Sequence, residues 1–407
     1  MKIKKAIGKI HLWLGLASGL IVFIVSITGA IYVFREEIFS AVHKDLLYVD
    51  NPGTERLSAS EAWDIAQGAL GEESVINYTA FYQQPNQSWA FMTYVGDPEA
   101  VTYFGMIKEY RTAYVNPYTG EVLGVMNNEY EFFSIIKNLH WSLLLSTKYG
   151  QSIVGWSTFI FVVMLISGIV LWWPKNKAAR KQRFSIKKFS QWRRFNYDLH
   201  NVLGFYISLV ALIIAFTGMV WAFTWFKGLV YVAASGTTVP PKIEQGISKF
   251  TEVDEKFNAV NTAYHKALAE YPDMYGMSIS KPHDSTSVVN VTVQQLEGLY
   301  YKQANLQYDQ YSGELLIHRK HSDKNFGEKL ITANYDIHVG AILGLPGKIL
   351  AFIASIICTS LPVTGFLIWW GRRNKNDREE VAKPTQLRKT AKPKLQKPKI
   401  KKEGASI

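Results

Sequence analysis

The chain of 407 residues is poor in cysteine and in charge. Its one cysteine, Cys358, lies inside an apolar run. A single cysteine excludes a disulfide scaffold, a Cys-ligated iron–sulfur cluster, a thiolate zinc site and a haem attached through a CxxCH motif. Charged residues make up 19% of the chain and apolar residues 48%, whereas about 25% of charged residues is typical of soluble proteins. The composition therefore argues against a soluble enzyme.

Nucleotide-binding and hydrolase signatures are absent as well. The sequence contains no Walker A motif, no HExxH, no GxSxG and no glycine-rich dinucleotide fingerprint on a strand–helix unit. Nothing in it resembles a flavin or nicotinamide site. If the chain handles electrons, their donor must be another molecule.

Four apolar runs are long enough to cross a bilayer, which needs about 20 residues. We predict spans at Ile10–Phe34, Ile153–Trp173, Val202–Phe226 and Ile349–Trp370. One long loop, residues 35–138, joins the first two spans, and a second, residues 227–336, joins the last two. The sequence therefore predicts a membrane protein with two large extramembrane segments.

Basic residues are concentrated in the N-terminus, the loop 174–198 and the tail 372–407. These segments hold 26 of the 45 Lys and Arg but only five of the 33 acidic residues, so they carry about +21 and the rest about −9. The positive-inside rule then places both termini in the cytoplasm and both long loops outside. We expect a disordered tail lying on anionic lipid, so the positive charge indicates a membrane rather than nucleic acid.

The two halves of the chain repeat each other, which indicates a tandem duplication of span, loop and span. Matching positions in the first and third spans are 189 residues apart: His11 and His200, Gly15 and Gly204, Thr28-Gly29 and Thr217-Gly218. His140, before the second span, matches His338, before the fourth, at an offset of 198.

Each long loop has the pattern of a small α+β domain. A Ser/Thr-x-x-acid start precedes a predicted helix, over Ala59–Leu70 in the first loop and Glu252–Tyr271 in the second. Short β-type runs and two turns follow, at Trp89–Tyr94, Thr112–Asn116, Asn116–Gly120, Ser287–Val293, Leu299–Asp309 and Asp309–Gly313. The predicted fold class is four transmembrane helices in two tandem repeats, with two small α+β domains outside the membrane.

The paired modules ending in NPYTGEVLG and DQYSGELLI, set between four histidine-bearing spans, resemble the PepSY-associated transmembrane-helix family over about residues 5–373. That family includes iron-uptake proteins, among them haem-containing inner-membrane reductases of ferric siderophores. The resemblance implies PepSY-like periplasmic domains, b-type haem and a ferric siderophore as the electron acceptor.

Four of the nine histidines lie beside the spans, one for each: His11, His140, His200 and His338. Ionisable residues at membrane depth are rare and usually functional. The predicted topology places His11 and His200 on the cytoplasmic side and His140 and His338 on the outer side. Because a six-coordinate haem iron takes two facing axial ligands, we pair His11 with His200 and His140 with His338. Two haems b are predicted, each ligated by both halves of the chain.

Two further features bear on these pairs. Small residues follow His11 and His200 at helical spacing, and Gly15 and Gly204 among them would let a flat porphyrin approach, although ordinary helix packing uses the same residues. A single helix from His140 to Trp172 would be about 48 Å long, which exceeds the bilayer. We therefore expect breaks near Lys148–Gly150 and Gly344–Gly347, with His140 and His338 on short helices at the outer surface.

Three functions fit this pattern, and we favour the first. It is electron transfer in the bacterial inner membrane, from a cytoplasmic reductase or quinol to a periplasmic ferric siderophore. The second is a non-enzymatic protein whose loop domains bind a peptide or envelope partner. The third is a metal permease, which is disfavoured because the spans hold no Asp or Glu and the histidines lie at their ends. His318 and His321, which flank Arg319-Lys320, could hold an anionic substrate or released iron.

Overall fold

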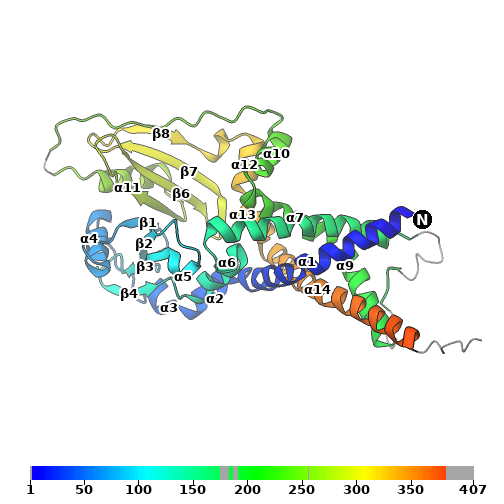
Figure 1. Ribbon diagram of the computed structural model, residues 1–407. Helices are drawn as coiled ribbons and strands as arrows, with labels where there is room; N and C mark the ends of the chain where they lie inside the picture. Colours follow the sequence, from blue (N-terminus) through cyan, green and yellow to red (C-terminus); the bar gives the residue numbers. More distant parts are fainter. Residues whose placement is uncertain (1, 175–182, 187–190, 255, 382–407) are drawn as a thin grey trace, which may run out of the picture.

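Four long helices and one β-sheet form most of the computed structural model, which describes residues 2–174, 183–186, 191–254 and 256–381 (Figure 1). The helices are α1 (Lys2–Tyr32), α7 (Thr147–Trp172), α9 (Trp192–Ala222) and α14 (Gly344–Val381). All four are long and apolar enough to cross a membrane, which confirms the four predicted spans. The tail from residue 382 onward and residues 175–182 and 187–190 of the predicted basic loop lie outside the described residues.

The long helices form a bundle in which both halves of the chain are interleaved. Helix α1 packs against α7 and α14, and α9 packs against the same two helices. Cys358 is buried in the centre of the bundle with Leu165, Ala211 and Ala354, and its thiol is free. Each helix of one half therefore contacts a helix of the other half along the membrane-spanning region.

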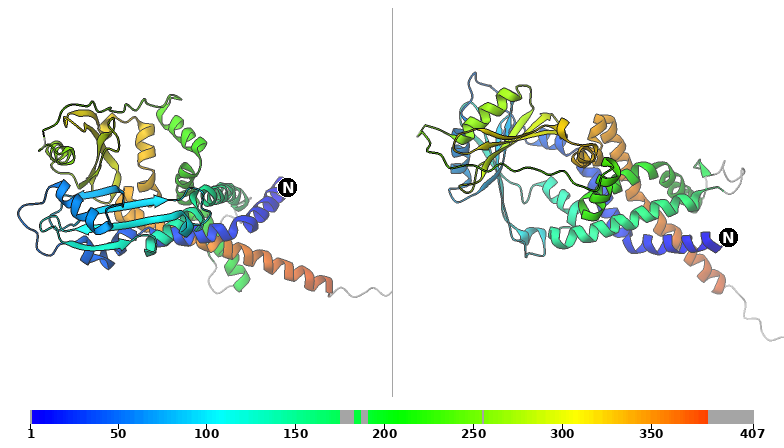
Figure 2. Two further views of the ribbon diagram at one scale, coloured as in Figure 1. Left: turned by 60° about the vertical axis from the view of Figure 1, so that its left-hand side comes forward. Right: turned by 90° about the horizontal axis from the view of Figure 1, so that it is seen from above.

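The sheet lies beyond one end of this bundle, while the N-terminus lies at the opposite end (Figure 2). It has eight strands in the order β4-β3-β2-β1-β5-β6-β7-β8, and all neighbours are antiparallel. The strands are β1 (Ile76–Tyr82), β2 (Trp89–Gly96), β3 (Ile107–Val115), β4 (Val122–Asn127), β5 (Gly276–Ser280), β6 (Val288–Leu296), β7 (Leu299–Asp309) and β8 (Leu315–Arg319).

The two predicted α+β domains are therefore not separate, because β1 of the first loop pairs with β5 of the second. Phe81 and Tyr82 face Met277 and Gly276 across this junction. One hydrophobic core packs under both halves of the sheet, and it includes residues of α4 (Ala59–Leu70) and α11 (Ala259–Glu270). The two long loops form a single body rather than two domains.

The first predicted helix has the predicted bounds, whereas the second begins later than predicted. Ser58 and Glu61 form a capping box at the start of α4. In the second loop, Asn258 is the residue that caps the helix, since its side chain accepts from the Asn261 N–H, so α11 starts at Ala259 and not at Glu252. The Thr251–Asp254 segment, which resembles a capping box in sequence, has no regular secondary structure and precedes this helix.

The four predicted β-type runs overlap β2, β3, β6 and β7, and the remaining four strands were not predicted. The two turns have the geometry that their glycines require. Gly120 has φ +76° and Gly313 has φ +65°, in the left-handed region that favours glycine.

Short helices connect the sheet to the bundle: α2 (Arg35–Val42), α3 (Lys44–Leu47), α5 (Tyr103–Met106), α6 (Phe132–Ser142), α10 (Thr224–Ser235), α12 (Phe326–Thr332) and α13 (Asn334–His338).

Sharp corners separate His140 and His338 from the spans that follow them. His140 lies on α6, and the chain turns at Leu143 and Leu144, whose φ values are +56° and +59°, before α7 begins. This break comes a few residues before the predicted Lys148–Gly150. His338 ends α13, and the second corner uses Gly340 and Gly344, with φ +80° and +66°. Both histidines are thus on short helices, as the length argument predicted.

Candidate functional site

His140 and His338 lie close together at the sheet end of the bundle, and we call them the sheet-proximal pair. Their ring centroids are 6.0 Å apart and the rings are inclined by 69°. With metal–nitrogen bonds of about 2.0 Å and about 1.2 Å from each nitrogen to its ring centre, two imidazoles on opposite sides of one metal have centroids roughly 6.4 Å apart. The spacing of the pair therefore suits two ligands of a single metal ion.

Each ring of this pair is held through Nδ1 by a span helix. The Nδ1 of His140 lies 2.8 Å from the Val25 carbonyl oxygen and 3.3 Å from the Thr28 hydroxyl of α1. The Nδ1 of His338 lies 3.1 Å from the Ile214 carbonyl oxygen and 2.8 Å from the Thr217 hydroxyl of α9. The two anchors are repeat-equivalent.

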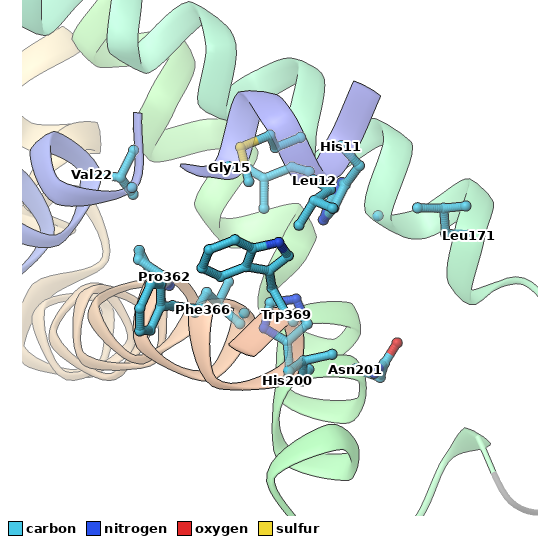
Figure 3. A pocket seen from close by; sticks show the side chains of 18 of the residues that line it. His11, Leu12, Gly15, Val22, Leu171, His200, Asn201, Pro362, Phe366 and Trp369 are labelled. Atoms are coloured by element: carbon cyan, nitrogen blue, oxygen red, sulfur yellow. The ribbon is translucent and has the colours of Figure 1, made fainter. Parts of the chain in front are cut away.

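His11 and His200 lie at the other end of the bundle, around a larger cavity, and we call them the sheet-distal pair. Figure 3 shows the two side chains on opposite sides of this cavity, with the Trp369 indole between them in that view. The Nδ1 of His11 is 2.9 Å from the Ser167 hydroxyl of α7. The Nδ1 of His200 is 2.9 Å from the Thr364 hydroxyl of α14.

One hydrogen-bond pattern thus serves all four histidines. Each Ser or Thr hydroxyl donates to a carbonyl of its own helix, so its oxygen accepts from the imidazole. Nδ1 then carries the proton, and Nε2 has a free lone pair. Within the described residues no hydrogen bond reaches Nε2 of any of the four. Metal-ligating histidines use this arrangement, in which one nitrogen donates to an oxygen acceptor and the other binds the metal.

A glycine follows each of these hydroxyl residues, and an imidazole lies over it. The pairs are Thr28-Gly29 for His140, Ser167-Gly168 for His11, Thr217-Gly218 for His338 and Thr364-Gly365 for His200. A Cβ on Gly29 would lie 3.0 Å from Cε1 of His140, and one on Gly365 would lie 3.3 Å from Cε1 of His200. The missing side chain makes room for the ring. We call these four dipeptides the histidine receptors.

The predicted cofactor contacts Gly15 and Gly204 both line the sheet-distal cavity. Met164 lies against Gly15 and Leu361 against Gly204, so each glycine also serves helix packing. This cavity has a volume of about 770 Å³, and its rim includes Arg183 and Arg372. The sheet-proximal cavity is smaller, about 280 Å³, and has Lys137 in its wall. Ligand pockets commonly measure about 300–1,000 Å³.

The residues present fit a b-type haem at each pair. Two neutral imidazoles with free Nε2 atoms would supply the nitrogen ligands of the iron, apolar helix surfaces would supply the walls, and the cationic side chains that line the cavities would suit the haem carboxylates. Among the described residues there is no group of three or more His, Cys, Asp or Glu side chains able to hold a metal ion. The chemistry of this site therefore rests on paired imidazoles rather than on a polydentate ion cage.

His318 and His321 lie elsewhere, on the outer part of the second half. The Tyr271 hydroxyl is 2.6 Å from Nε2 of His318, which uses that nitrogen in a structural contact. His321 packs edge-on against Tyr301. Neither residue lines the cavity of a histidine pair.

The histidine receptors are the functional feature that sequence reasoning missed. Thr28-Gly29 and Thr217-Gly218 were recognised only as repeated positions, and Ser167 and Thr364 were not singled out. A signal was present, because every span carries one Ser/Thr-Gly dipeptide at a repeat-equivalent position.

Four membrane-length helices, a continuous sheet beyond one end of their bundle and two pairs of half-buried imidazoles, each held through Nδ1 by a Ser or Thr hydroxyl, define a multi-pass membrane protein with two candidate cofactor sites between its helices. A family model described as the PepSY-associated TM region matches residues 9–372, nearly the whole chain, and the chain belongs to this family. No curated protein sequence matches the chain.

Proposed function

We propose that this protein is a di-haem b electron-transfer protein of the bacterial inner membrane that reduces a periplasmic ferric siderophore. The observation that carries the proposal is the pairing of four imidazoles with free Nε2 atoms, each pair taking one histidine from each half of the chain. A structural role alone would not require the same donor pattern at four positions. The order of elements supports an origin by tandem duplication, with PepSY-like outer segments that share one sheet.

The orientation follows from charge. The N-terminus, residues 174–198 and the tail carry about +21, and the remainder carries about −9, so the positive-inside rule favours a cytoplasmic position for these segments. The sheet and the sheet-proximal pair are then periplasmic, and the sheet-distal pair faces the cytoplasm. A topology reporter at Gln182 should behave as cytoplasmic, and reporters at Asn86 and Asp284 as periplasmic. The opposite result would reverse the proposed direction.

The chain's own residues hold and tune the site. His11 with His200, and His140 with His338, would each hold one haem, which when bound supplies one-electron redox chemistry. The histidine receptors fix the Nδ1–H tautomer and the ring orientation. Hydrogen bonding at Nδ1 also raises the basicity of Nε2. The apolar walls of both cavities keep water away from the ligand nitrogens.

The positions of the two histidine pairs support a path in which electrons enter at the sheet-distal pair and leave at the sheet-proximal pair. A ferric siderophore is bulky and polar, so it cannot enter the hydrocarbon core and must be reduced at the outer surface. Electrons would enter at the sheet-distal pair from a cytoplasmic reductase or from quinol in the surrounding lipid. Iron would be released on reduction because hard oxygen ligands hold ferric iron far better than ferrous iron.

The deciding experiment is a reduced-minus-oxidised visible spectrum of the protein purified from haem-replete cells. We expect a b-type signal and about two haems per chain. A colourless protein would contradict the proposal and favour a non-enzymatic role in which the outer segments bind a peptide or envelope partner.

A further inference from the structure

Arg35 is a cation located where the bundle meets the sheet. It is the first residue of α2, directly after α1. Its guanidinium lies 6.0 Å from the ring centroid of Tyr32 and 5.4 Å from that of Phe39. Within the described residues it forms no hydrogen bond or ion pair. The adjacent carboxylates are engaged elsewhere, since Glu36 accepts from the Tyr300 hydroxyl at 3.0 Å and Glu37 pairs with Lys348 at 2.8 Å.

Lys137 is a second cation, close to the first. It lies on α6, one turn before His140, and lines the sheet-proximal cavity. The part of the chain that the structure describes offers its ammonium group no hydrogen bond and no ion pair. Burial, and then the positive charge of Arg35, lower the pKa of Lys137. Two like charges are thus held near each other. Glu131, the carboxylate that acts on Lys137, already caps the start of α6.

Four tyrosines lie within electrostatic range of Arg35. Tyr32 and Tyr335 line the sheet-proximal cavity, while Tyr82 and Tyr114 come from β1 and β3 of the sheet. Arg35 acts electrostatically on all four. None of the four hydroxyls has a hydrogen-bond partner among the described residues. Burial raises the pKa of Tyr114 to about 12 and also raises the pKa of Tyr82 and of Tyr335, so these three hydroxyls stay neutral at physiological pH and can donate.

We call Arg35, Lys137, Tyr32, Tyr82, Tyr114 and Tyr335 the donor cluster. It contains two cations and four hydroxyl donors, and the nearby carboxylates are already paired or capping. Such a set suits a ligand rich in anionic oxygen, because hydrogen bonds to a charged acceptor are roughly twice as strong as neutral ones. Figure 1 shows α2 and α6 between the sheet and the long helices, so the cluster lies at the point where a periplasmic molecule would come nearest to His140 and His338.

We propose that the donor cluster binds the terminal electron acceptor, and that this acceptor is an anionic, oxygen-ligated iron(III) chelate rather than a neutral or cationic one. This inference rests on the proposed function. The cluster shares Tyr32, Lys137 and Tyr335 with the sheet-proximal cavity. An acceptor bound there would thus lie beside the histidine pair assigned to the outer end of the electron path. The alternative occupant of the donor cluster is the pair of carboxylates of a bound haem. Loss of Arg35 would weaken chelate binding in the first case and haem binding in the second.

The test uses the purified, haem-loaded protein and gallium(III) citrate, an anionic chelate that resembles its iron counterpart and cannot be reduced under these conditions. Binding is measured by isothermal titration for the parent protein, for Arg35→Gln and for Lys148→Gln. The control removes one positive charge from the same side of the bundle, at an exposed lysine paired with Glu99. We expect Arg35→Gln to weaken binding about 10- to 100-fold, the range for a lost charge-assisted hydrogen bond. Lys148→Gln should bind like the parent.

Three results would overturn the inference. The parent protein could fail to bind gallium citrate at millimolar concentration, or Arg35→Gln could bind as tightly as the parent. Alternatively, Arg35→Gln could lose one of its haems, which would identify the cluster as a cofactor contact. Failure of the proposed function is distinguishable from all three, because it would appear first as a parent protein that carries no haem.

Discussion

The two histidine pairs share one hydrogen-bond pattern and differ in their surroundings. The sheet-proximal pair sits on the short helices α6 and α13, with ring centroids 6.0 Å apart beside a cavity of about 280 Å³. The sheet-distal pair sits on the spans themselves, beside a cavity of about 770 Å³. The histidine rings are therefore held by the same hydrogen bond to a Ser or Thr hydroxyl in a small cavity and in a large one.

The tryptophans at the distal end sharpen this difference. Trp172 is 3% exposed and stacks on Phe205, with ring centroids 3.6 Å apart. Its repeat-equivalent, Trp369, is half-buried and lines the sheet-distal cavity. Both copies of the repeated residue line the sheet-distal cavity, but only Trp172 is fixed by a stacked ring. The duplicated scaffold thus keeps its polar anchors, whereas the apolar residues around the distal pair pack differently in the two halves.

The largest expected effect is on the rate of haem reoxidation, which should distinguish the pair where electrons leave from the pair where they enter. In His140→Ala or His338→Ala, reoxidation of the remaining haem by added ferric siderophore should slow by orders of magnitude, because the distal pair lies across a core roughly 30 Å thick. In His11→Ala, a chemical reductant applied from the sheet side should still support siderophore reduction, whereas cellular donors should not. Stopped-flow absorbance measures both. Unchanged reoxidation in His140→Ala would show that the proximal pair is not the exit.

The next effect tests the pairing itself. His11→Ala and His200→Ala should each lose the same single haem and keep the other, so that the stoichiometry falls from about two per chain to about one. The reason is that both residues line one cavity. Pyridine haemochrome assay and electron paramagnetic resonance identify which haem remains. Loss of different haems in the two variants would contradict the pairing, and retention of both would show that neither residue is a ligand.

A smaller effect compares the glycines of the proximal receptors. A Cβ at position 29 would lie 3.0 Å from Cε1 of His140, whereas one at position 218 would lie 3.7 Å from Cε1 of His338, an ordinary contact. Gly29→Ala should therefore lower stability by about 1–3 kcal/mol through overpacking and weaken haem retention. Gly218→Ala should be nearly neutral and serves as the matched control. Thermal unfolding in detergent, followed at the haem band, measures both effects. Equal losses of stability in the two variants would contradict the closer approach of His140 to Gly29.

The smallest effect concerns the hydroxyls, compared across the two pairs. Thr217→Val and Thr364→Val remove one acceptor from Nδ1 of His338 and His200. The backbone carbonyls of Ile214 and Leu361 remain as acceptors. Since the Nε2 lone pair becomes less basic, the ferric state is less stabilised and each midpoint potential should rise, by no more than about 59 mV, a tenfold change for one electron. Spectroelectrochemical titration decides, and a fall in potential would contradict the assigned tautomer.

Sequence reasoning reached the spans, the pairing of the histidines and their short helices because these depend on local hydrophobicity and on repeat offsets. It did not reach the single sheet. Alternation along β1 and β5 indicates strands at most, and it carries no information on which distant edges will meet. Strand β5 is only five residues long, and β4 is interrupted by Gly124, so both give weak local signals. The receptors were missed because a Ser/Thr-Gly pair in an apolar helix is ordinary packing until a ring lies over it.

The junction between β1 and β5 has a consequence for synthesis of the chain. Thr79 is fully buried there, and its hydroxyl accepts from the Ile279 N–H at 2.8 Å and donates to the Ile279 carbonyl at 3.0 Å, across 200 residues of sequence. At about 5–20 residues per second, β1 leaves the ribosome roughly 10–40 s before β5 and waits as an uncovered strand edge, the kind of surface that recruits foreign strands. The same interval leaves His11 and His140 without their partners. The second half of the chain therefore covers the exposed edge of β1 in the first half. Premature termination within the second half would leave an aggregation-prone fragment rather than a protein with one working site.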